Sequence, residues 1–362
     1  MASYNRYDEQ QIRRGIEEWL PERLGVHDLR VTKLSTPAAS GASALTFLFD
    51  VAYRDETGAE TEEGFVARVV PKDPNAGGLF MRYDLDLEAA LMRAAAPLVP
   101  VADLVAVEAT DTKVFGNPFL ITRFINGRVV SDAPPLTSPD SWVWSLPEAG
   151  QAKLADECLR ALVAVQRADL QPGLLPAPGT SNAIAALIDD WEAYYHWAKR
   201  PEDDRPHRVF DATLAYLRAN LPDDEPMVVN WGDSRIGNMV YGADLETLAV
   251  LDWEMACHGS PEIDLGWFLF HMRWTTEGYG LPQLPGFPSE TQVVERFEEL
   301  SGHIVRHRHF YEMFAGLRMV ALGIRHAVLL EDAGVVPKDA DIARNNPGVQ
   351  VTERLLEQGA GV

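Results

Sequence analysis

The chain has 362 residues, of which 46% are hydrophobic, and its 54 acidic residues outnumber 32 basic ones to give a formal net charge of −22. This length and apolar content predict two domains of ordinary size, each with its own core. The charge argues against a nucleic-acid-binding protein, because phosphate contacts need clustered Lys and Arg. The acidity indicates either a soluble surface or a preference for a cationic substrate.

The cysteine pattern and the apolar runs give no sign of secretion or of a membrane span. Cys158 and Cys257 lack the spacing of a metal or disulfide framework, so a cytoplasmic, reducing setting is expected. The N-terminus has no apolar stretch of signal-peptide length, and no uninterrupted apolar run reaches about 18 residues. The nearest candidate, residues 314–330, contains Arg318, Arg325 and His326 and is typical of an amphipathic helix.

The first 125 residues predict a helix followed by a sheet. Residues 8–24 carry Ile12, Ile16 and Leu20 at helical spacing. The first three expected strands form an antiparallel meander, with an acidic turn at 55–64 between the second and third. Later strands complete a sheet of five or six. The expected strands are 29–34, 45–53, 65–70, 104–108, 114–115 and 119–124.

The remainder of the chain is mostly helical by pattern. Residues 125–127 (Ile-Asn-Gly) are interpreted as the hinge between two domains, 1–125 and 126–362. The fold class is therefore α+β, with a small N-terminal lobe built on an antiparallel sheet and a larger, mostly helical C-terminal lobe. The expected helices are 84–96 in the first lobe and 147–167, 182–199, 209–221, 261–274, 290–302, 305–330 and 337–358 in the second.

Polar residues gather in the stretch between positions 226 and 265. Residues 230–238 (NWGDSRIGN) are too rich in glycine and charge to continue a strand, and they predict a loop that presents side chains. Two short apolar runs after it flank a turn at Gly242-Ala243-Asp244 and predict an antiparallel hairpin. With that turn centred near Leu245, Asn238 and Asp252 fall directly across from each other.

This pairing predicts a magnesium site. Opposed residues have Cβ atoms roughly 5 Å apart, so the amide oxygen of Asn238 and the carboxylate of Asp252 can share one hard cation. Asp233, on the loop before the hairpin, can accept the proton of a hydroxyl that attacks a metal-bound phosphate. Each residue also has an ordinary structural interpretation, either in bonding loop amides or in ending a buried strand.

The N-terminal lobe contains a second group of candidate residues. Arg68 lies within an apolar strand, where a charge must be paired or exposed. With the preceding turn near Gly58, Arg68 opposes Leu48. Glu88, on the apolar face of the helix at 84–96, is its candidate partner, or else an acid favoured by the helix dipole. The small-residue loop around Ser43 lets backbone amides approach a phosphate, or simply turns a corner.

The spacing of Asp233, Asn238 and Asp252 resembles the catalytic-loop pattern of the aminoglycoside phosphotransferase and choline kinase families, relatives of the protein kinases. There, HxDxxxxN is followed one hairpin later by a metal-binding Asp. Residues 259–261 (Gly-Ser-Pro) with 264–265 (Asp-Leu) are similar to the downstream GDPxxDL stretch of these kinases. The most similar branch includes kinase-like domains fused to acyl-CoA dehydrogenases. The resemblance implies a bilobal protein-kinase-like fold with a nucleotide-binding first lobe.

The resemblance also implies an activity, the transfer of the ATP γ-phosphate to a hydroxyl of a small molecule with Mg²⁺. Asp233 would be the catalytic base, while Asn238 and Asp252 would hold the metal. Arg235 could reach the transferred phosphoryl group, or be a solvated loop cation. Asp264 would brace the loop from the following helix.

For the nucleotide, the resemblance implies that Arg68 and Glu88 replace the family's Lys–Glu pair at the phosphates, with the Ser43 loop covering them. The adenine would lie against the backbone of Thr122, Arg123, Phe124 and Ile125. Two departures from the pattern stand out: Arg68 replaces the usual Lys, and Asn230 replaces the His that begins the loop and chiefly braces it. An Asn could keep one of that residue's hydrogen bonds.

Two rival functions stay open from sequence alone. Asn230 and Arg68 favour a nucleotide-binding protein without turnover. A metal-dependent hydrolase would instead use Asp233, Asn238, Asp252 and Glu254. The acceptor is open too, because an acidic chain suits an amino-sugar or other amine, whereas the dehydrogenase-associated relatives indicate a hydroxyacyl compound or its CoA ester.

Overall fold

The computed structural model describes residues 8–37, 43–55, 57–110, 113–170, 175, 182–223 and 226–359. The chain divides into two compact units. Unit 1 comprises Met1–Met92, Val101–Asn126 and Leu329–Pro337, and unit 2 comprises Arg93–Pro100, Gly127–Val328 and Lys338–Val362. Residues 40–42 of the predicted small-residue loop lie outside the described residues.

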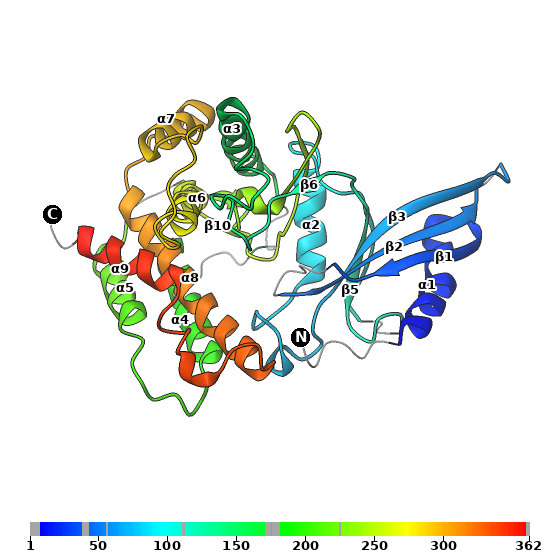
Figure 1. The fold of residues 1–362 in the computed structure, drawn as a ribbon, viewed down its shortest axis with the longest axis horizontal. Helices are drawn as coiled ribbons and strands as arrows, with labels where there is room; N and C mark the ends of the chain where they lie inside the picture. The colour runs from blue at the N-terminus through cyan, green and yellow to red at the C-terminus, as the bar shows by residue number, and fades with distance from the viewer. Residues whose placement is uncertain are drawn as a thin grey trace. The chain divides into compact units, whose positions relative to one another are not determined.

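Unit 1 is built on an antiparallel sheet with the strand order β1-β2-β3-β5-β4 (Figure 1). The sequence-based sheet is confirmed with five strands, since residues 114–115 lie in a turn. Val114 and Phe115 are buried in the core of the unit, which explains their apolar character without a sixth strand. The strands are β1 (His27–Ser35), β2 (Leu45–Arg54), β3 (Glu60–Val69), β4 (Leu104–Glu108) and β5 (Phe119–Arg123).

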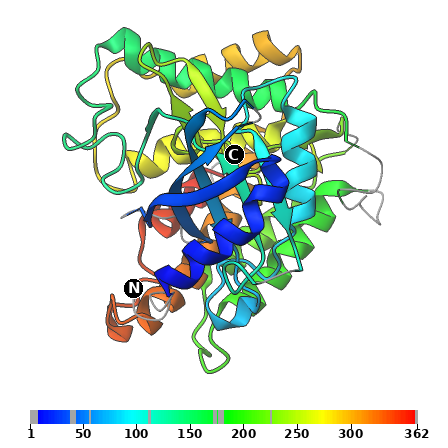
Figure 2. The same ribbon diagram turned by 90° about the vertical axis from the view of Figure 1, so that its right-hand side faces the viewer.

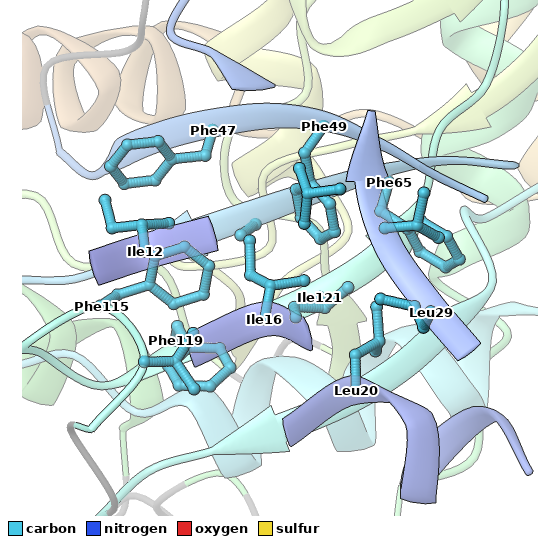
Figure 3. Packing of buried hydrophobic residues seen from close by; sticks show 14 of the residues in the cluster. Ile12, Ile16, Leu20, Leu29, Phe47, Phe49, Phe65, Phe115, Phe119 and Ile121 are labelled. Atoms are coloured by element: carbon cyan, nitrogen blue, oxygen red, sulfur yellow. The ribbon is translucent and has the colours of Figure 1, made fainter. Parts of the chain in front are cut away.

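Helix α1 (Glu9–Leu24) packs against this sheet. It begins where the Asp8 carboxylate accepts the Gln10 N–H at 2.9 Å, and it ends at Gly25 with φ +67°. Figure 2 shows the helix running along the sheet. Its buried face and the sheet form one apolar core, in which Figure 3 shows Ile12, Ile16 and Leu20 among Leu29, Phe47, Phe49, Phe65, Phe115, Phe119 and Ile121.

The β2–β3 hairpin differs from the predicted register by two residues. Arg68 pairs with Thr46, and not with Leu48. The loop closes between Asp55 and Ala59, where the Asp55 carboxylate accepts both the Thr57 hydroxyl at 2.6 Å and the Ala59 N–H at 3.0 Å. The turn is therefore centred one residue before Gly58, and a shift of one residue in the centre of a hairpin moves every pair by two.

Unit 2 contains most of the helices and two small sheets, in the orders β6-β8-β9 and β10-β7. Its helices are α3 (Glu148–Val165), α4 (Ala183–Ala198), α5 (Arg208–Ala219), α6 (Glu262–Thr275), α7 (Glu290–Ser301), most of α8 (Arg308–Asp332) and α9 (Pro347–Gly359). Helix α2 (Leu85–Ala95) lies mostly in unit 1. The strands of unit 2 are β6 (Arg128–Val129), β7 (Val228–Asn230), β8 (Met239–Tyr241), β9 (Thr247–Val250) and β10 (Cys257–Gly259).

Every predicted helix is present, but the last is shorter than expected. The prediction of one helix over 337–358 is wrong, because α9 begins only at Pro347, after a short 3₁₀ turn at Lys338–Ala340. Proline is well placed at the first position of a helix but not in its interior. The Asn346 side chain caps the new start by accepting the Val349 N–H at 3.1 Å.

Helix α6 is the buried centre of unit 2, in contact with α7 and α9 (Figure 1). Helix α8 is long and apolar enough to cross a membrane by length and composition alone, yet 67% of its most apolar window is buried in the structure, as is common for a core helix. Both helices carry charged side chains inward, Asp264 on α6 and Arg318 on α8. These two charges converge on the loop that follows β7.

Candidate active site

The loop between β7 and the 3₁₀ turn η2 (Ile236–Asn238) is held by the carboxylate of Asp264. One oxygen of this group accepts the Trp231 N–H and the other accepts the Gly232 N–H, both at 2.8 Å. The Asp264 carbonyl also accepts the Ser234 hydroxyl at 2.8 Å. Burial raises the pKa of Asp264 to about 6, against the lowering effect of these N–H donors. The bracing contacts expected of Asp264 are therefore present in the structure.

Arg318 holds the same loop from the other side. Its Nη2 donates to the Gly232 carbonyl at 2.6 Å, and its guanidinium lies 4.2 Å from the centre of the Trp267 ring. In the sequence, this residue indicates only an amphipathic helix. The signal that could have identified it was a cation among the apolar residues of that helix, since a buried charge requires a partner.

Asn230 does not brace the loop as the family's His would. Its side chain is fully buried, and Nδ2 makes only a long 3.5 Å contact with the Val228 carbonyl of its own strand. Its Oδ1 has no hydrogen-bond partner among the described residues. Asp264 and Arg318 supply the backbone contacts that fix the loop, so the substitution at position 230 leaves the loop held.

Asp233 is fixed by several donors within unit 2. Oδ1 accepts the Trp267 Nε1–H at 2.6 Å, Oδ2 accepts the Asn238 Nδ2–H at 2.6 Å, and the Arg235 Nε–H lies 3.1 and 3.2 Å from the two oxygens. Burial by itself would raise the pKa of Asp233, but the charge of Arg235, the electrostatic effect of His271 and the bonds from Trp267 and Asn238 together outweigh burial and lower the pKa. Asp233 is therefore an ionised carboxylate in a fixed orientation. No motif in the sequence points to Trp267 as a partner of Asp233.

Arg235 is a bridge between two carboxylates, which decides against the solvated loop cation. Its Nη1 lies 2.5 Å from Asp132 Oδ1 while its Nε contacts Asp233, and its side chain is only 18% exposed. Burial disfavours the charged guanidinium, yet Asp233 and Asp132 raise its pKa. The guanidinium therefore stays charged beside the proposed catalytic carboxylate.

The hairpin after the loop differs from the predicted register by one residue. Leu251, and not Asp252, lies across from Asn238, whose carbonyl accepts the Leu251 N–H at 2.8 Å. The turn closes between Gly242 and Glu246, so its centre lies one residue before Leu245, which by itself would shift the pairing by two residues. An irregularity in the pairing near Leu248 reduces this shift to one residue.

Asp252 nevertheless lies next to the loop, because of contacts from Trp231 that the strand pattern alone does not predict. The Trp231 indole N–H donates to the Leu251 carbonyl at 2.8 Å and to the Asp252 carbonyl at 3.2 Å. Asp252 has φ +62°, a left-handed conformation that ends the strand and breaks its alternation of faces. Asp233 is therefore joined to Asn238, and Asn238 is joined through the Leu251 backbone to Trp231 and the backbone carbonyl of Asp252.

The ligand chemistry at these residues fits a magnesium ion that also binds phosphate. Asn238 uses its Nδ2 toward Asp233, which directs its Oδ1 away and leaves an amide oxygen for a cation. Within the described part of the chain, no three His, Cys, Asp or Glu side chains gather as a metal site. Mg²⁺ commonly takes one or two protein oxygens and completes its shell with phosphate and water.

In unit 1, Arg68 and Glu88 form the predicted pair. Arg68 Nη1 lies 2.8 Å from both carboxylate oxygens of Glu88, and Arg68 Nη2 lies 3.4 Å from the Ser43 hydroxyl. The pair is largely buried, with side-chain exposures of 17% for Arg68 and 4% for Glu88. The three side chains that the sequence analysis placed at the nucleotide phosphates thus lie together.

The segment predicted to lie against the adenine, residues 122–125, begins in β5 and extends two residues beyond it. Thr122 pairs with Val66, Arg123 forms an ion pair with Glu63, and the Phe124 N–H donates to the Gly64 carbonyl at 2.8 Å. Phe124 is 48% exposed, a high fraction for a large apolar side chain, and Ile125 is half-buried. These contacts fix the path of the backbone in this segment of unit 1.

The loop geometry requires glycine at position 232. Gly232 has φ +89°, and a Cβ there would lie 2.0 Å from the Met255 carbonyl oxygen. Gly232→Ala should therefore destabilise the protein by about 3 kcal/mol or more, from strain and a backbone clash together. Urea unfolding measures this loss.

The matched control is Gly302→Ala, because Gly302 has φ +73° and a Cβ added there would meet nothing within 4 Å. This variant should lose only about 1–2 kcal/mol, from backbone strain alone. Equal losses for the two variants would show that the Met255 contact does not constrain the loop.

Comparisons with known proteins agree with this geometry. The family described as phosphotransferase enzyme family matches residues 36–288. Acyl-CoA dehydrogenase family member 11 of Gallus gallus is 30% identical over 175 residues, which are 46% of this chain and 20% of that relative. Among its curated acyl-CoA dehydrogenase relatives, the chain spans from 18% to 36% of their own length.

Two solved structures share the fold. A Ralstonia eutropha protein provisionally named an aminoglycoside phosphotransferase has a TM-score of 0.68 at 21% identity, over 95% of this chain and 98% of its own. A thermostable variant of an aminoglycoside phosphotransferase, in ternary complex with AMP-PNP and hygromycin B, has a TM-score of 0.60 at 18% identity, over 96% and 99%. The predicted α+β, protein-kinase-like fold is therefore confirmed. Because the family match covers more than half of the sequence, this chain belongs to the phosphotransferase enzyme family.

Proposed function

We propose that the protein is an ATP- and Mg²⁺-dependent phosphotransferase that moves the γ-phosphoryl group to a hydroxyl of a small molecule. One observation carries the proposal, the chain of contacts that joins Asp233 to Asn238 and, through backbone groups, to Asp252. Asn238 lies 2.6 Å from Asp233, its carbonyl accepts the Leu251 N–H at 2.8 Å, and Trp231 contacts the Asp252 carbonyl at 3.2 Å. A base, an amide oxygen and a carboxylate are the groups that phosphoryl transfer needs.

In the proposed reaction the acceptor oxygen forms a bond to the γ-phosphorus while the bond from that phosphorus to the β–γ bridging oxygen breaks. The products are the phosphorylated acceptor and ADP, and the hydroxyl proton passes to Asp233 or to water. Because the pKa of Asp233 is lowered, this carboxylate is a weak base that mainly orients the hydroxyl. A loose phosphoryl transition state demands little more than such positioning.

The metal and phosphate contacts follow from the donor atoms. Asn238 Oδ1 and the Asp252 carboxylate would hold Mg²⁺, which supplies charge neutralisation at the phosphate oxygens. In unit 1, Arg68 would donate to the phosphates from the orientation that Glu88 imposes on it. Two protein ligands make a poor metal site without a phosphate, so this arrangement supports a kinase over a metal-dependent hydrolase.

Two observations bear on the acceptor, and they support two different classes of compound. The acidic chain suits an amine, and one solved neighbour is complexed with hygromycin B. The curated relatives carry the name of acyl-CoA dehydrogenases, which suits a hydroxyacyl compound.

Asp252→Ala should abolish Mg²⁺-dependent nucleotide binding, because it removes the one metal-ligating carboxylate of the proposed pair. Calorimetric titration with ATP, with and without Mg²⁺, measures this effect. Asp244→Ala, in the exposed turn of the same hairpin, is the control and should bind as the wild type does. Unchanged Mg-ATP binding by Asp252→Ala would contradict the metal assignment.

Asp233→Asn should lower kcat by about 10²-fold or more, since it removes the carboxylate that orients and deprotonates the acceptor. ATP affinity should stay within about twofold of wild type, because Asp233 is not assigned to the nucleotide. Acceptor-dependent ADP formation is the measurement. A normal kcat would remove Asp233 from the mechanism, whereas ATP binding by the wild type with no turnover on any alcohol would favour the rival without transferase activity.

Arg68→Met should weaken ATP binding by about tenfold or more, because a charge-assisted contact to phosphate is lost. The control is Arg30→Met on β1 of the same sheet, where Arg30 forms an exposed ion pair with Glu60. This control should leave the dissociation constant for ATP unchanged. Thermal melting should accompany both titrations, because breaking the buried Arg68–Glu88 pair also lowers stability, and equal ATP affinity in a folded Arg68→Met would refute the assignment.

A further inference from the structure

Three side chains within unit 2 already donate to the Asp233 carboxylate. The Trp267 indole N–H donates to Oδ1 and the Asn238 amide N–H donates to Oδ2, each at 2.6 Å. Arg235 Nε donates between the two oxygens, at 3.1 and 3.2 Å. Because a carboxylate offers about four lone-pair sites, the described residues leave about one of them for the hydroxyl of a phosphoryl acceptor.

The contact between Arg235 and Asp233 is unusual for an arginine. A guanidinium commonly meets a carboxylate through two parallel N–H groups, and Nη2 lies on the same edge of the guanidinium as the Nε–H. Only Nε contacts Asp233, however, and in the part of the chain that the structure describes Nη2 of Arg235 makes no hydrogen bond. A small rotation of the guanidinium would bring Nη2 to one oxygen and Nε to the other, and would fill the site that the acceptor needs.

Asp132 opposes this rotation. Its Oδ1 lies 2.5 Å from Arg235 Nη1, the nitrogen that lies outside the edge formed by Nε and Nη2. The Arg235 side chain is only 18% exposed, so this pair is less screened by water than an ion pair between two surface residues. The pull of Asp132 on Nη1 therefore keeps Nη2 away from Asp233.

The backbone on both sides of this contact belongs to one small unit. Val129, three residues before Asp132, pairs with Val240 of β8, the strand that follows η2. A Cβ added to Gly237 of η2 would lie only 3.3 Å from Asp132 Oδ1, so the carboxylate lies directly against this turn. Asp132 thus reaches Arg235 from a segment that is hydrogen-bonded to the catalytic hairpin.

We infer that Asp132 is a positioning residue, which holds Arg235 so that Asp233 keeps a lone pair for the hydroxyl of the phosphoryl acceptor. The inference rests on the proposed phosphotransferase function. Asp132 acts through the guanidinium and is assigned no contact with the acceptor. Without Asp132, Arg235 turns both Nε and Nη2 to Asp233, and the hydroxyl loses the atom that orients it. The effect applies to every acceptor, water included, because it concerns only the reacting O–H group.

Hydrolysis of Mg-ATP, with water as the acceptor, tests this role through ADP formation. Asp132→Ala should lower kcat by about tenfold, because a charge-assisted hydrogen bond that orients Arg235 is lost. The KM for ATP should not change, since Asp132 is not assigned to the nucleotide. Asp132→Glu keeps the carboxylate and should regain most of the rate. Asp140→Asn is the matched control, because it removes an exposed carboxylate farther along the same loop, and it should keep the wild-type kcat.

A double-mutant cycle tests whether Asp132 acts through Arg235. Arg235→Met removes the group that Asp132 restrains, so adding Asp132→Ala to Arg235→Met should change kcat by less than about twofold. A merely structural role of Asp132 would instead lower kcat by the same factor in both backgrounds. That additive result, or a wild-type kcat in Asp132→Ala, would overturn the inference.

A crystal structure of Asp132→Ala gives a readout that does not depend on turnover. Arg235 should contact Asp233 through both Nε and Nη2. A guanidinium that still donates only Nε would overturn the inference and leave the phosphotransferase function intact, whereas a wild type that forms no ADP even with water would contradict the proposed function itself. If Asp132→Ala does not fold, Asp132→Asn, which keeps the shape of the side chain, replaces it in each experiment.

Discussion

The carboxylate of Asp264 is the group on which the site in unit 2 depends. It lies on α6, a helix buried along most of its length, and accepts the N–H groups of two successive loop residues at 2.8 Å. Arg318 holds the carbonyl of the second of these residues from α8. A buried carboxylate is costly, as its pKa of about 6 shows, but removing it would leave two buried donors without acceptors. The loop is thus fixed by two helices that are distant in sequence.

This bracing allows backbone conformations that would otherwise be unfavourable. Gly232 and Asp252 both have positive φ, +89° and +62°, and each lies where the chain leaves a strand. Trp231 connects the two positions, since its backbone N–H binds Asp264 and its indole N–H binds the carbonyls of Leu251 and Asp252. The replacement of the family's His by Asn230 is compatible with such a loop, because the backbone contacts do not pass through position 230.

The same rigid loop supports the role proposed for Asp233. Donors from Trp267, Asn238 and Arg235 surround its carboxylate and lower its pKa, which makes it better suited to orientation than to strong base catalysis. Trp267 and His271 lie one turn apart on α6, so one helix supports Asp233 and also forms part of the wall of a small pocket next to Arg235.

The sequence by itself determined most of the helices and strands and indicated where the candidate site lies. Hydrophobic periodicity located the helices and the sheet, and the spacing of Asp233, Asn238 and Asp252 indicated phosphoryl transfer, because both signals are local. The tertiary structure decided the registers, where the bonds of Asp55 and the irregularity near Leu248 shifted the predicted pairs by two residues and by one. It also decided which buried groups support the loop and line the pocket. Trp267 lies 34 residues from Asp233 in sequence, and His271 and Arg318 lie farther still. Only side-chain packing brings an indole, an imidazole and a charge from such distances to one loop.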